Sequence, residues 1–230
     1  MPRRVDVRHT YERIGPHFAR TRAYAWPEVE SFVADASVDS PEAVGLDLGC
    51  GNCRHAETLA TRVDRVVGLD ASRSLLEAGR TRAGDRDFGD ALTLCQGDVS
   101  TLPFRADAVD LAVYVATLHH LPSRDDRRAS LDELARVLAP TGRGLVSAWS
   151  TAHDRFEDHD ATAAEGFDTT VEWTLPDGET VDRFYHIYAP AEFEADLEAS
   201  GLEIVEWELS SGNCYATVSG RTDVGAEAGR

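Results

Sequence analysis

The chain has 230 residues and a formal net charge of −18, and its length suits one domain with a full hydrophobic core. No apolar run approaches the roughly eighteen residues of a membrane span, and no segment has the apolar core of a signal peptide. We therefore expect a soluble, cytoplasmic protein. Four cysteines in a chain of this length exclude a disulfide framework.

The basic residues are all arginines, 23 in number. An excess of carboxylates keeps a protein hydrated in concentrated salt, so the composition predicts a halophile and is weak evidence against nucleic-acid binding. The distribution of charge along the chain is more informative than the net charge. Residues 1–27 hold six arginines against two carboxylates, whereas residues 151–230 hold four arginines against nineteen. The first segment is either a functional basic pole or a solvated basic helix end.

The first 36 residues are predicted to form a helical cap ahead of the first strand. Residues 7–36 indicate two helices broken by Gly15-Pro16, with Pro27 in the first turn of the second helix. Aromatic and basic side chains alternate in this cap, a mixture that suits stacking on bases and pairing with carboxylates. They are Tyr11, His17, Phe18, Arg20, Arg22, Tyr24 and Trp26.

Strands and helices then alternate, which predicts a doubly wound parallel sheet. Strands are expected over 44–48, 65–70, 91–96, 109–115 and 144–149, with helices over 53–61, 72–82 and 124–138. The glycines that follow Pro140 indicate a turn into the last of these strands.

The remainder of the chain begins with a polar stretch, residues 151–180, which we expect to be a surface loop. Further elements are a strand over 183–188, a helix over 191–200, and an antiparallel pair over 202–209 and 214–218. A single domain would then span residues 1–218, with a disordered tail over 219–230.

The turn after the first strand is the most informative motif. An apolar run, an acid and two glycines one residue apart describe a buried strand that turns into a helix, as in nucleotide sites. Gly49 and Gly51 can adopt positive φ and allow a ligand to approach the backbone. Asp70, near the end of the next strand, is placed to accept both hydroxyls of a ribose.

The acid before these glycines decides the type of cofactor. Phosphate-binding turns carry a glycine or alanine where this chain has Arg54, and Asp47 would repel a phosphate but suit an ammonium group. The pattern resembles class I methyltransferases, whose cofactor S-adenosylmethionine has an ammonium, a sulfonium and a ribose. Cys53 replaces the third glycine of that family, which makes the helix packing less certain. A purely structural glycine loop, or a metal or thiol site at Cys50 and Cys53, are weaker alternatives.

Residues after the third and fourth strands complete the predicted cofactor site. Asp98 and Val99 follow the third strand, where they would hold an adenine by its amino edge and one face. The fourth strand ends at the carboxyl edge of the sheet, where ligands of such sheets bind. The predicted cofactor-binding residues are Asp47, Gly49, Gly51, Asp70, Ala71, Asp98, Val99 and Val115. The predicted class is α/β, a Rossmann-like doubly wound seven-stranded sheet with an N-terminal helical cap and antiparallel C-terminal strands.

Five segments carry a closer resemblance, and the N-terminal segment and Arg183–His186 are much more specific than the glycine turn. They are Tyr11–Phe18 with Thr21-Arg22 and Trp26-Pro27, the turn Asp47–Asn52, His119–Leu121, Arg183–His186 and Gly212-Asn213. With them the chain resembles the tRNA wobble-uridine carboxymethyl methyltransferases from about residue 7 to 218. The resemblance implies esterification of the carboxymethyl group on C5 of the wobble uridine, and a heterodimer with a small zinc-binding activator protein.

The resemblance also implies roles for side chains near the reacting groups. A carboxylate is already a competent nucleophile, so the reaction needs orientation and desolvation more than a strong base. Arg22 or Arg183 would hold one carboxylate oxygen, and the other would face the methyl group. His119, His120 and His186 would bond to the uracil or the carboxylate, and Asn213 would read the base. Structural roles remain open: one histidine of the pair could be packed, and Asn213 could simply form a tight turn.

Two other functions fit the same core motifs. One is a methyltransferase for a small molecule such as a quinone, which the basic cap and the C-terminal segments argue against. The other is a non-catalytic cofactor-binding subunit of a tRNA-modifying complex, which the intact cofactor motifs argue against, although Cys53 mildly favours it. We also expect a partner strand to cover an open sheet edge, so that the chain alone would be poorly soluble or bind cofactor weakly.

Overall fold

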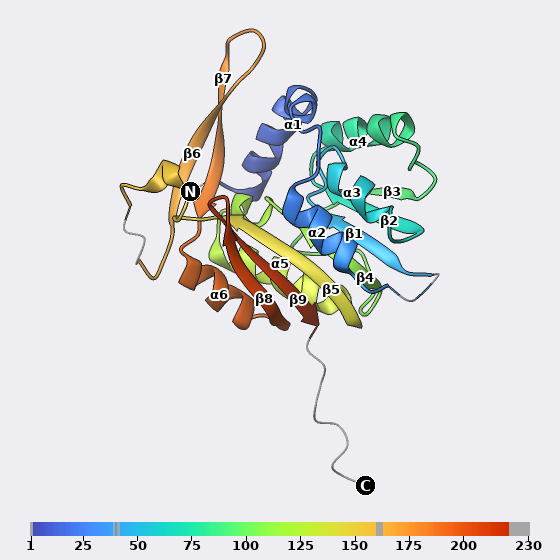
Figure 1. Cartoon of the computed structure of the whole chain (residues 1–230). Helices are drawn as coiled ribbons and strands as arrows, with labels where there is room; N and C mark the ends of the chain where they lie inside the picture. Colours follow the sequence, from blue (N-terminus) through green and yellow to red (C-terminus); the bar gives the residue numbers. More distant parts are fainter. Residues whose placement is uncertain (1, 39, 41, 160–162, 221–230) are drawn as a thin grey trace, which may run out of the picture.

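The computed structural model describes residues 2–38, 40, 42–159 and 163–220 (Figure 1). Its main sheet consists of β1 (Val44–Leu48), β2 (Arg65–Asp70), β3 (Leu92–Gln96), β4 (Val109–Tyr114), β5 (Leu138–Trp149), β8 (Leu202–Ser210) and β9 (Asn213–Gly220). The strand order is β3-β2-β1-β4-β5-β9-β8. The first five strands are parallel, and β9 runs antiparallel to both β5 and β8. The predicted fold class is confirmed.

Helices cover both faces of this sheet (Figure 1). They are α1 (Arg4–Arg20), α2 (Pro27–Asp35), α3 (Arg54–Leu59), α4 (Arg73–Asp85), α5 (Arg124–Val137) and α6 (Pro190–Glu198), with short 3₁₀ turns η1 (Leu118–His120) and η2 (Asp154–Phe156). One apolar core joins the sheet to α5 and α6, and a second joins it to α2, α3 and α4. Among the described residues, no helix combines the length and apolar character needed to cross a membrane.

The prediction that Gly15-Pro16 breaks the N-terminal helix is wrong, because α1 continues through both residues. Proline has no N–H to donate to the carbonyl of Glu12, and the hydroxyl of Ser74 in α4 donates to that oxygen instead, at 2.9 Å. A Cβ on Gly15 would lie 2.3 Å from the same hydroxyl oxygen. The two residues therefore allow α1 to pack closely on α4 rather than ending it.

The predicted turn before residue 144 is also wrong, because β5 begins at Leu138. The pairing of β5 with β4 shifts register between Val109 and Leu111. A Cβ on Gly142 would lie 2.7 Å from the carbonyl oxygen of Val109, so glycine is needed where the two strands approach closely. The turn-like sequence marks an irregularity inside a longer strand.

Residues 151–180 are not simply a loop. They contain η2 and β6 (Phe167–Thr174), which pairs antiparallel with β7 (Thr180–Ile187) in a separate two-stranded sheet. Aromatic and apolar residues from this region form a small core with Trp149. The acids and threonines between Phe167 and Trp173 make this segment polar overall, so its alternating strand pattern was not recognised. Residues 160–162 of this segment, and 221–230 of the predicted tail, lie outside the described residues.

Cys53 fits the glycine turn because another glycine makes room for it. Gly49, Gly51 and Cys53 have φ values of +69°, +53° and +60°, in the left-handed region that favours glycine. The Cys53 side chain is fully buried. A Cβ on Gly79 of α4 would lie 2.5 Å from its sulfur. The turn has a cysteine in place of its third glycine, and Gly79 on the helix that packs against the turn leaves the space for that side chain.

Gly79→Ala should lower the free energy of unfolding by about 1–3 kcal/mol, because the new methyl group overlaps the Cys53 sulfur. Gly84→Ala is the matched control on the same helix. No atom lies within 4 Å of its Cβ position, so this change should be neutral or stabilising by up to about 1 kcal/mol. Urea unfolding measures both. Cys53→Gly should suppress the effect of Gly79→Ala, and equal stability of the two alanine variants would contradict this packing.

Candidate active site

A cavity of about 640 Å³ lies at the carboxyl ends of the first parallel strands. Its size suits a nucleoside-containing ligand. Six predicted cofactor residues line it: Gly49, Gly51, Asp70, Ala71, Asp98 and Val99. Two do not, because Asp47 lies beneath the turn and Val115 lines a neighbouring cavity. The N-terminal part of α1 forms the opposite wall, as the predicted cap would.

Asp70 joins the glycine turn to the start of α4. Its two carboxylate oxygens accept backbone N–H bonds from Gly51 and Ser72, each at 2.8 Å. Burial raises the pKa of this carboxyl to about 6, although the backbone bonds act in the opposite direction. Because Asp70 also lines the cavity, its remaining lone pairs are available to hydroxyl groups of a ligand.

Asp47 is buried beneath the glycine turn rather than exposed to the cavity. It accepts a hydrogen bond from the backbone N–H of Ala56 in the first turn of α3, at 2.9 Å. Burial raises the pKa of Asp47 to about 7, and the Ala56 bond opposes this shift. A direct contact with a ligand ammonium group, as predicted, is therefore not part of this arrangement. The carboxylate can act on a bound cation only through its field.

Asp98 is shared between the cavity and α1. Its Oδ2 accepts from the guanidinium of Arg4 at 2.8 Å, and its Oδ1 accepts from the N–H of Ser100 at 2.9 Å. Arg4 also forms an ion pair with Asp126 at 3.3 Å. An adenine amino group at Asp98, as predicted, would share this carboxylate with Arg4.

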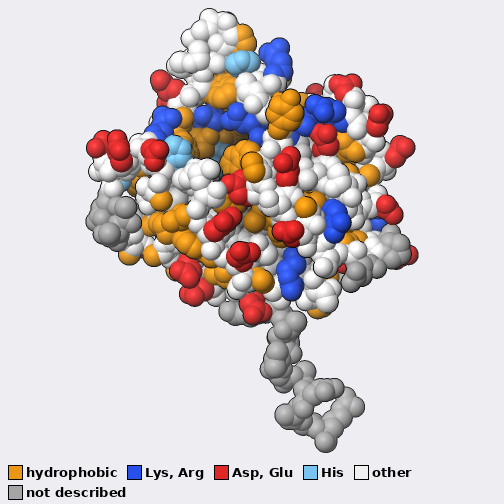
Figure 2. All heavy atoms as spheres, in the orientation of Figure 1, with side chains coloured by type: hydrophobic (Ala, Val, Ile, Leu, Met, Phe, Trp, Pro, Cys, Tyr) orange, Lys and Arg blue, Asp and Glu red, His pale blue; other side chains and the backbone are white. Residues whose placement is uncertain are grey.

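A second cavity, of about 340 Å³, adjoins the first. Its wall contains four arginines, four histidines and four large aromatic residues, but no aspartate or glutamate among the described residues that line it. The basic and aromatic residues are Arg22, Arg54, Arg155, Arg183, His55, His119, His120, His153, Phe18, Trp26, Trp149 and Tyr185. Figure 2 shows basic side chains gathered between the β6–β7 hairpin and α1, with acidic side chains across the lower part of this face.

The arginines of this second cavity lie against aromatic rings instead of carboxylates. The guanidinium carbon of Arg22 is 4.4 Å from the centre of the Phe18 ring. That of Arg183 is 5.0 Å from the centre of the Trp173 ring. Arg22 and Arg183, predicted from distant parts of the sequence, therefore converge on one aromatic cluster. Such stacking holds a guanidinium in place while leaving its N–H donors free.

These guanidinium groups form no ion pair among the described residues, and the buried carboxylate of Asp47 only partly opposes the lowering of the Arg54 pKa. Burial lowers the pKa of Arg54 to about 10, and the nearby charge of Arg22 adds to the shift. Burial also lowers the pKa of Arg22. Arg183 is buried and donates from Nη1 to the Tyr185 hydroxyl at 2.6 Å, yet its Nε has no hydrogen-bond partner among the described residues. Uncompensated positive charge and an unsatisfied buried donor together favour an anionic ligand.

The two neighbouring histidines are both held by hydrogen bonds. His119 is buried, and its Nδ1 accepts the backbone N–H of Trp149 at 2.9 Å. Burial places the pKa of His119 well below its usual value. His120 lines both cavities and is bonded through Nδ1 to the carbonyl oxygen of Phe184 and through Nε2 to the hydroxyl of Tyr11.

His186 lies away from the predicted site. Its Nδ1 is 2.8 Å from Asp168 and its Nε2 is 3.0 Å from Glu192, so it ties the β6–β7 hairpin to α6. Successive side chains of a strand point to opposite faces, and Arg183 and Tyr185 are the β7 residues that reach the second cavity. The predicted catalytic role of His186 is therefore replaced by an anchoring role. Asn213 does line the second cavity.

Trp173 is the main residue that the sequence analysis missed. Besides Arg183, it contacts the ring of Phe18, with 5.2 Å between ring centres, and its Nε1 donates to His17 at 3.2 Å. It comes from β6, which was predicted to be a loop. The alternation from Phe167 to Trp173 was the signal that could have identified it.

Comparison with known proteins agrees with this geometry. Residues 46–146 match the methyltransferase domain family. The chain has the fold of class I methyltransferases. The tRNA (carboxymethyluridine(34)-5-O)-methyltransferase of Xenopus tropicalis is 33% identical over 148 residues, which cover 64% of this chain and 21% of that protein. The enzyme of that name from Arabidopsis thaliana is 30% identical over 148 residues, covering 64% and 33%. This methyltransferase thus matches a fifth to a third of the length of these relatives, and the resemblance in its sequence is confirmed.

Solved structures with the same fold extend over most of the methyltransferase. The DhpI-SAM-HEP complex has a TM-score of 0.68 at 21% identity, covering 93% of this chain and 96% of that one. A complex of the Haloferax volcanii Trm112 methyltransferase activator has a TM-score of 0.69 at 17% identity, covering 94% and 98%.

S-adenosylmethionine is the cofactor of this fold, and the first cavity fits it. A Cβ on Gly51 would meet no atom within 4 Å, so the glycine turn leaves open space beside Asp70. When bound, the cofactor supplies a methyl group on a sulfonium.

Asp47→Asn tests the part played by the buried carboxylate. Its folded-state pKa is raised above the unfolded value, so ionised Asp47 destabilises the fold above about pH 7, and this effect disappears as pH falls towards about 4. At pH 8 the variant should gain about 2 kcal/mol in free energy of unfolding. It should also bind S-adenosylmethionine at least about tenfold more weakly, because a field that favours the cationic ligand is lost.

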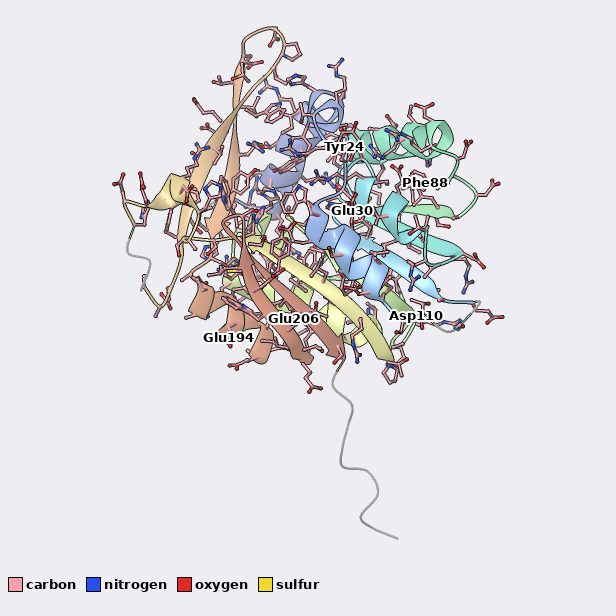
Figure 3. All side chains as sticks on the ribbon, viewed as in Figure 1. Tyr24, Glu30, Phe88, Asp110, Glu194 and Glu206 are labelled. Carbon is pink, nitrogen blue, oxygen red and sulfur yellow. The ribbon has the colours of Figure 1, made fainter. Side chains whose placement is uncertain are left out.

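Urea unfolding and calorimetric titration measure the two effects of Asp47→Asn. Asp110→Asn is the matched control, because Asp110, labelled in Figure 3, accepts the backbone N–H of Val44 at the start of β1 and lines neither cavity. It should leave cofactor affinity unchanged. Unchanged cofactor affinity in Asp47→Asn would contradict the electrostatic role.

Proposed function

We propose that this methyltransferase transfers the methyl group of S-adenosylmethionine to the carboxymethyl group on C5 of the wobble uridine in tRNA. The observation that carries the proposal is the second cavity, which adjoins the cofactor cavity and presents four arginines without a carboxylate. In a chain with a net charge of −18, such a cavity is suited to an anion. The names of the relatives from Xenopus tropicalis and Arabidopsis thaliana support the same reaction.

The residues of the second cavity can orient a substrate carboxylate. The free Nε of Arg183 and the stacked guanidinium of Arg22 would bind one oxygen, which leaves the second oxygen as nucleophile. As the new oxygen–carbon bond forms, the carbon–sulfur bond breaks, and its electron pair stays on sulfur. No proton is transferred in this step. The protein therefore needs to position and desolvate the carboxylate rather than supply a base.

The remaining lining suits an unpaired nucleotide. Trp149 lies beside His153, with 5.3 Å between ring centres, and Asn213 lies on the same wall. Single-stranded bases are recognised by stacking on aromatic rings and by hydrogen bonds to their edges. We propose that Asn213 reads the uracil, and that the flipped wobble base enters the second cavity, which Trp149 and Asn213 both line.

The N-terminal cap contributes less free charge than its composition indicates. Arg3, Arg4 and Arg13 form ion pairs with Asp6, Asp98 and Glu179, respectively. No ion pair is found for Arg8, Arg20 or Arg22 among the described residues. Arg22 is assigned above to the substrate carboxylate and Arg8 lines the cofactor cavity, so Arg20 is the one that we propose to meet the phosphates of the anticodon loop.

The two alternative functions are less compatible with these cavities. A quinone-like substrate would not require four guanidinium groups around the reacting carbon. A non-catalytic subunit would not require a substrate-sized cavity that shares Gly49, Gly51 and His120 with the cofactor cavity. The packing of Cys53 against Gly79 also removes the sequence feature that favoured a non-catalytic role.

Arg183→Ala and Arg22→Ala should each lower kcat/KM by about 100-fold or more with tRNA that carries carboxymethyluridine, since a charge-assisted hydrogen bond to the substrate is lost. Affinity for S-adenosylmethionine should change by less than about twofold. Arg105→Ala, at an exposed arginine outside both cavities, is the matched control. The measurement is transfer of labelled methyl groups from the cofactor to tRNA. Full activity of both cavity variants would contradict the proposal.

We further propose that a small activator protein pairs with this methyltransferase at β3. The Haloferax volcanii Trm112 activator is bound to a methyltransferase of the same fold. Both β3 and β8 are edge strands of the main sheet. Strand β3 leads directly into Gln96, Gly97 and Asp98, which line the cofactor cavity, so a partner strand there would steady the cofactor site.

Amide hydrogen exchange can distinguish the two edges. The Ala91 carbonyl and the Gly97 N–H are bonded to β2, so strand alternation directs the N–H groups of Leu94 and Gln96 outwards, whereas the Leu92 N–H donates to the Gly89 carbonyl. Addition of the activator should slow exchange at the amides of Leu94 and Gln96 and tighten cofactor binding about tenfold or more. Protection along β8 instead, or equal cofactor affinity with and without the partner, would contradict this assignment.

A further inference from the structure

Tyr24 is an aromatic side chain that the N-terminal cap leaves uncovered. It lies in the segment that joins α1 to α2 (Figure 3), and it is 76% exposed. Among the described residues, the other large hydrophobic side chains that are exposed are Val205 and Leu209, two aliphatic residues of β8. Tyr24 is thus the exposed aromatic ring in the part of the chain that the structure describes.

The other aromatic side chains of the cap are occupied by contacts within the protein. Each has at least one other ring beside it, and Phe18 and Trp26 also carry an arginine guanidinium on one face. The aromatic residues with ring contacts are Tyr11, His17, Phe18 and Trp26. For Tyr24, neither a ring contact nor a guanidinium contact is found among the described residues. Of the cap residues predicted to stack on bases, Tyr24 is therefore the one that is free to do so.

The backbone that carries Tyr24 is held in place by side chains of the cofactor-binding core. The guanidinium of Arg82 in α4 donates to the Ala23 carbonyl at 2.7 Å, and that of Arg54 in α3 donates to the Tyr24 carbonyl at 3.3 Å. Asn52, from the glycine turn, donates to two carbonyls just before them, each at 2.9 Å. Because the backbone is already ordered, a partner of the Tyr24 ring gains contact area at a small cost in conformational entropy.

This segment forms the rim of the second cavity. Arg22 and Trp26, two residues before and two residues after Tyr24, both line that cavity, and so does Arg54, which holds the Tyr24 carbonyl. Arg20 is exposed just before them. The uncovered ring is therefore surrounded by guanidinium groups that have no ion pair among the described residues. An aromatic ring beside unpaired positive charge is the combination that binds single-stranded nucleic acid.

We propose that Tyr24 stacks on an unpaired nucleobase that adjoins the flipped wobble uridine. This inference rests on the proposed tRNA reaction and adds a point of contact outside the cavity. Every base has a π-face, so the contact adds affinity without reading the identity of that base. A protein surface is the other partner that would cover such a ring. The unpaired guanidinium groups beside Tyr24 favour a partner that carries phosphates instead.

A double-mutant cycle between the protein and the RNA tests this contact. Three anticodon stem-loops with carboxymethyluridine are compared in the presence of S-adenosylhomocysteine: an intact one, and two that lack the base just before or just after the wobble uridine. The wild-type protein should bind one of the two abasic loops about tenfold or more weakly. Tyr24→Ala should lose a similar factor with the intact loop, and removal of the same base should then weaken binding by less than about twofold further.

Two control variants separate stacking from other effects. Tyr24→Phe should restore the affinity of the wild type, because stacking requires the ring and not the hydroxyl. Leu209→Ala is the matched control, since Leu209 is also exposed but lines neither cavity, and it should leave RNA affinity unchanged. Exchange of the neighbouring base for any of the other three should change affinity by less than about threefold.

Independent, additive effects of Tyr24→Ala and base removal would overturn the proposal. So would weaker binding of the activator protein by Tyr24→Ala with RNA affinity unchanged, which would assign the ring to a protein partner. If either result occurs while the wild type still prefers a wobble carboxylate to a neutral group, this inference fails and the proposed reaction stands. Failure of the wild type to bind the intact stem-loop would overturn both.

Discussion

The site depends on positive charge that the protein leaves uncompensated. Although carboxylates outnumber arginines in this chain, none of the described carboxylates lines the cavity that contains Arg22, Arg54, Arg155 and Arg183. Desolvation and mutual repulsion of these guanidinium groups oppose folding, and stacking on aromatic rings offsets only part of that effect. An anionic ligand would supply the missing partner. The proposed function uses this cavity for a substrate charge, and the neighbouring cavity, which Asp70 and Asp98 line, for a cationic cofactor.

The α1 helix contributes residues to both cavities. Its first residue, Arg4, bonds to Asp98 in the wall of the first cavity, whereas Tyr11 reaches His120 at the boundary between the cavities. Phe18, near its end, lies beneath the guanidinium of Arg22. The helix can run unbroken past Pro16 only because Ser74 of α4 satisfies the carbonyl that proline leaves free. Its packing on α4 therefore sets the position of residues in both cavities.

Much of the fold followed from the sequence, because strand and helix periods in the central region are regular. The glycine turn identified most of the cofactor cavity for the same reason, since positive φ and an acid at the next strand are local requirements. The wrong predictions have a common physical origin, because each depends on a tertiary contact that a local sequence pattern cannot show. Ser74 of α4 donates to the α1 carbonyl that Pro16 leaves without a partner, so the helix continues. The polar stretch 167–174 forms strand β6 because it pairs with β7. His186 was placed in the site by its sequence motif, but strand alternation directs it towards Glu192.

The most direct test of the central claim compares two anticodon stem-loops in the presence of S-adenosylhomocysteine, which prevents methyl transfer. One carries carboxymethyluridine at the wobble position, and the other carries the neutral carbamoylmethyluridine of nearly the same shape. If the arginine cavity binds a substrate carboxylate, the first should bind about 30-fold or more tightly than the second, and the difference should disappear in Arg183→Ala. Equal affinity of the two stem-loops for the wild-type protein would contradict the account.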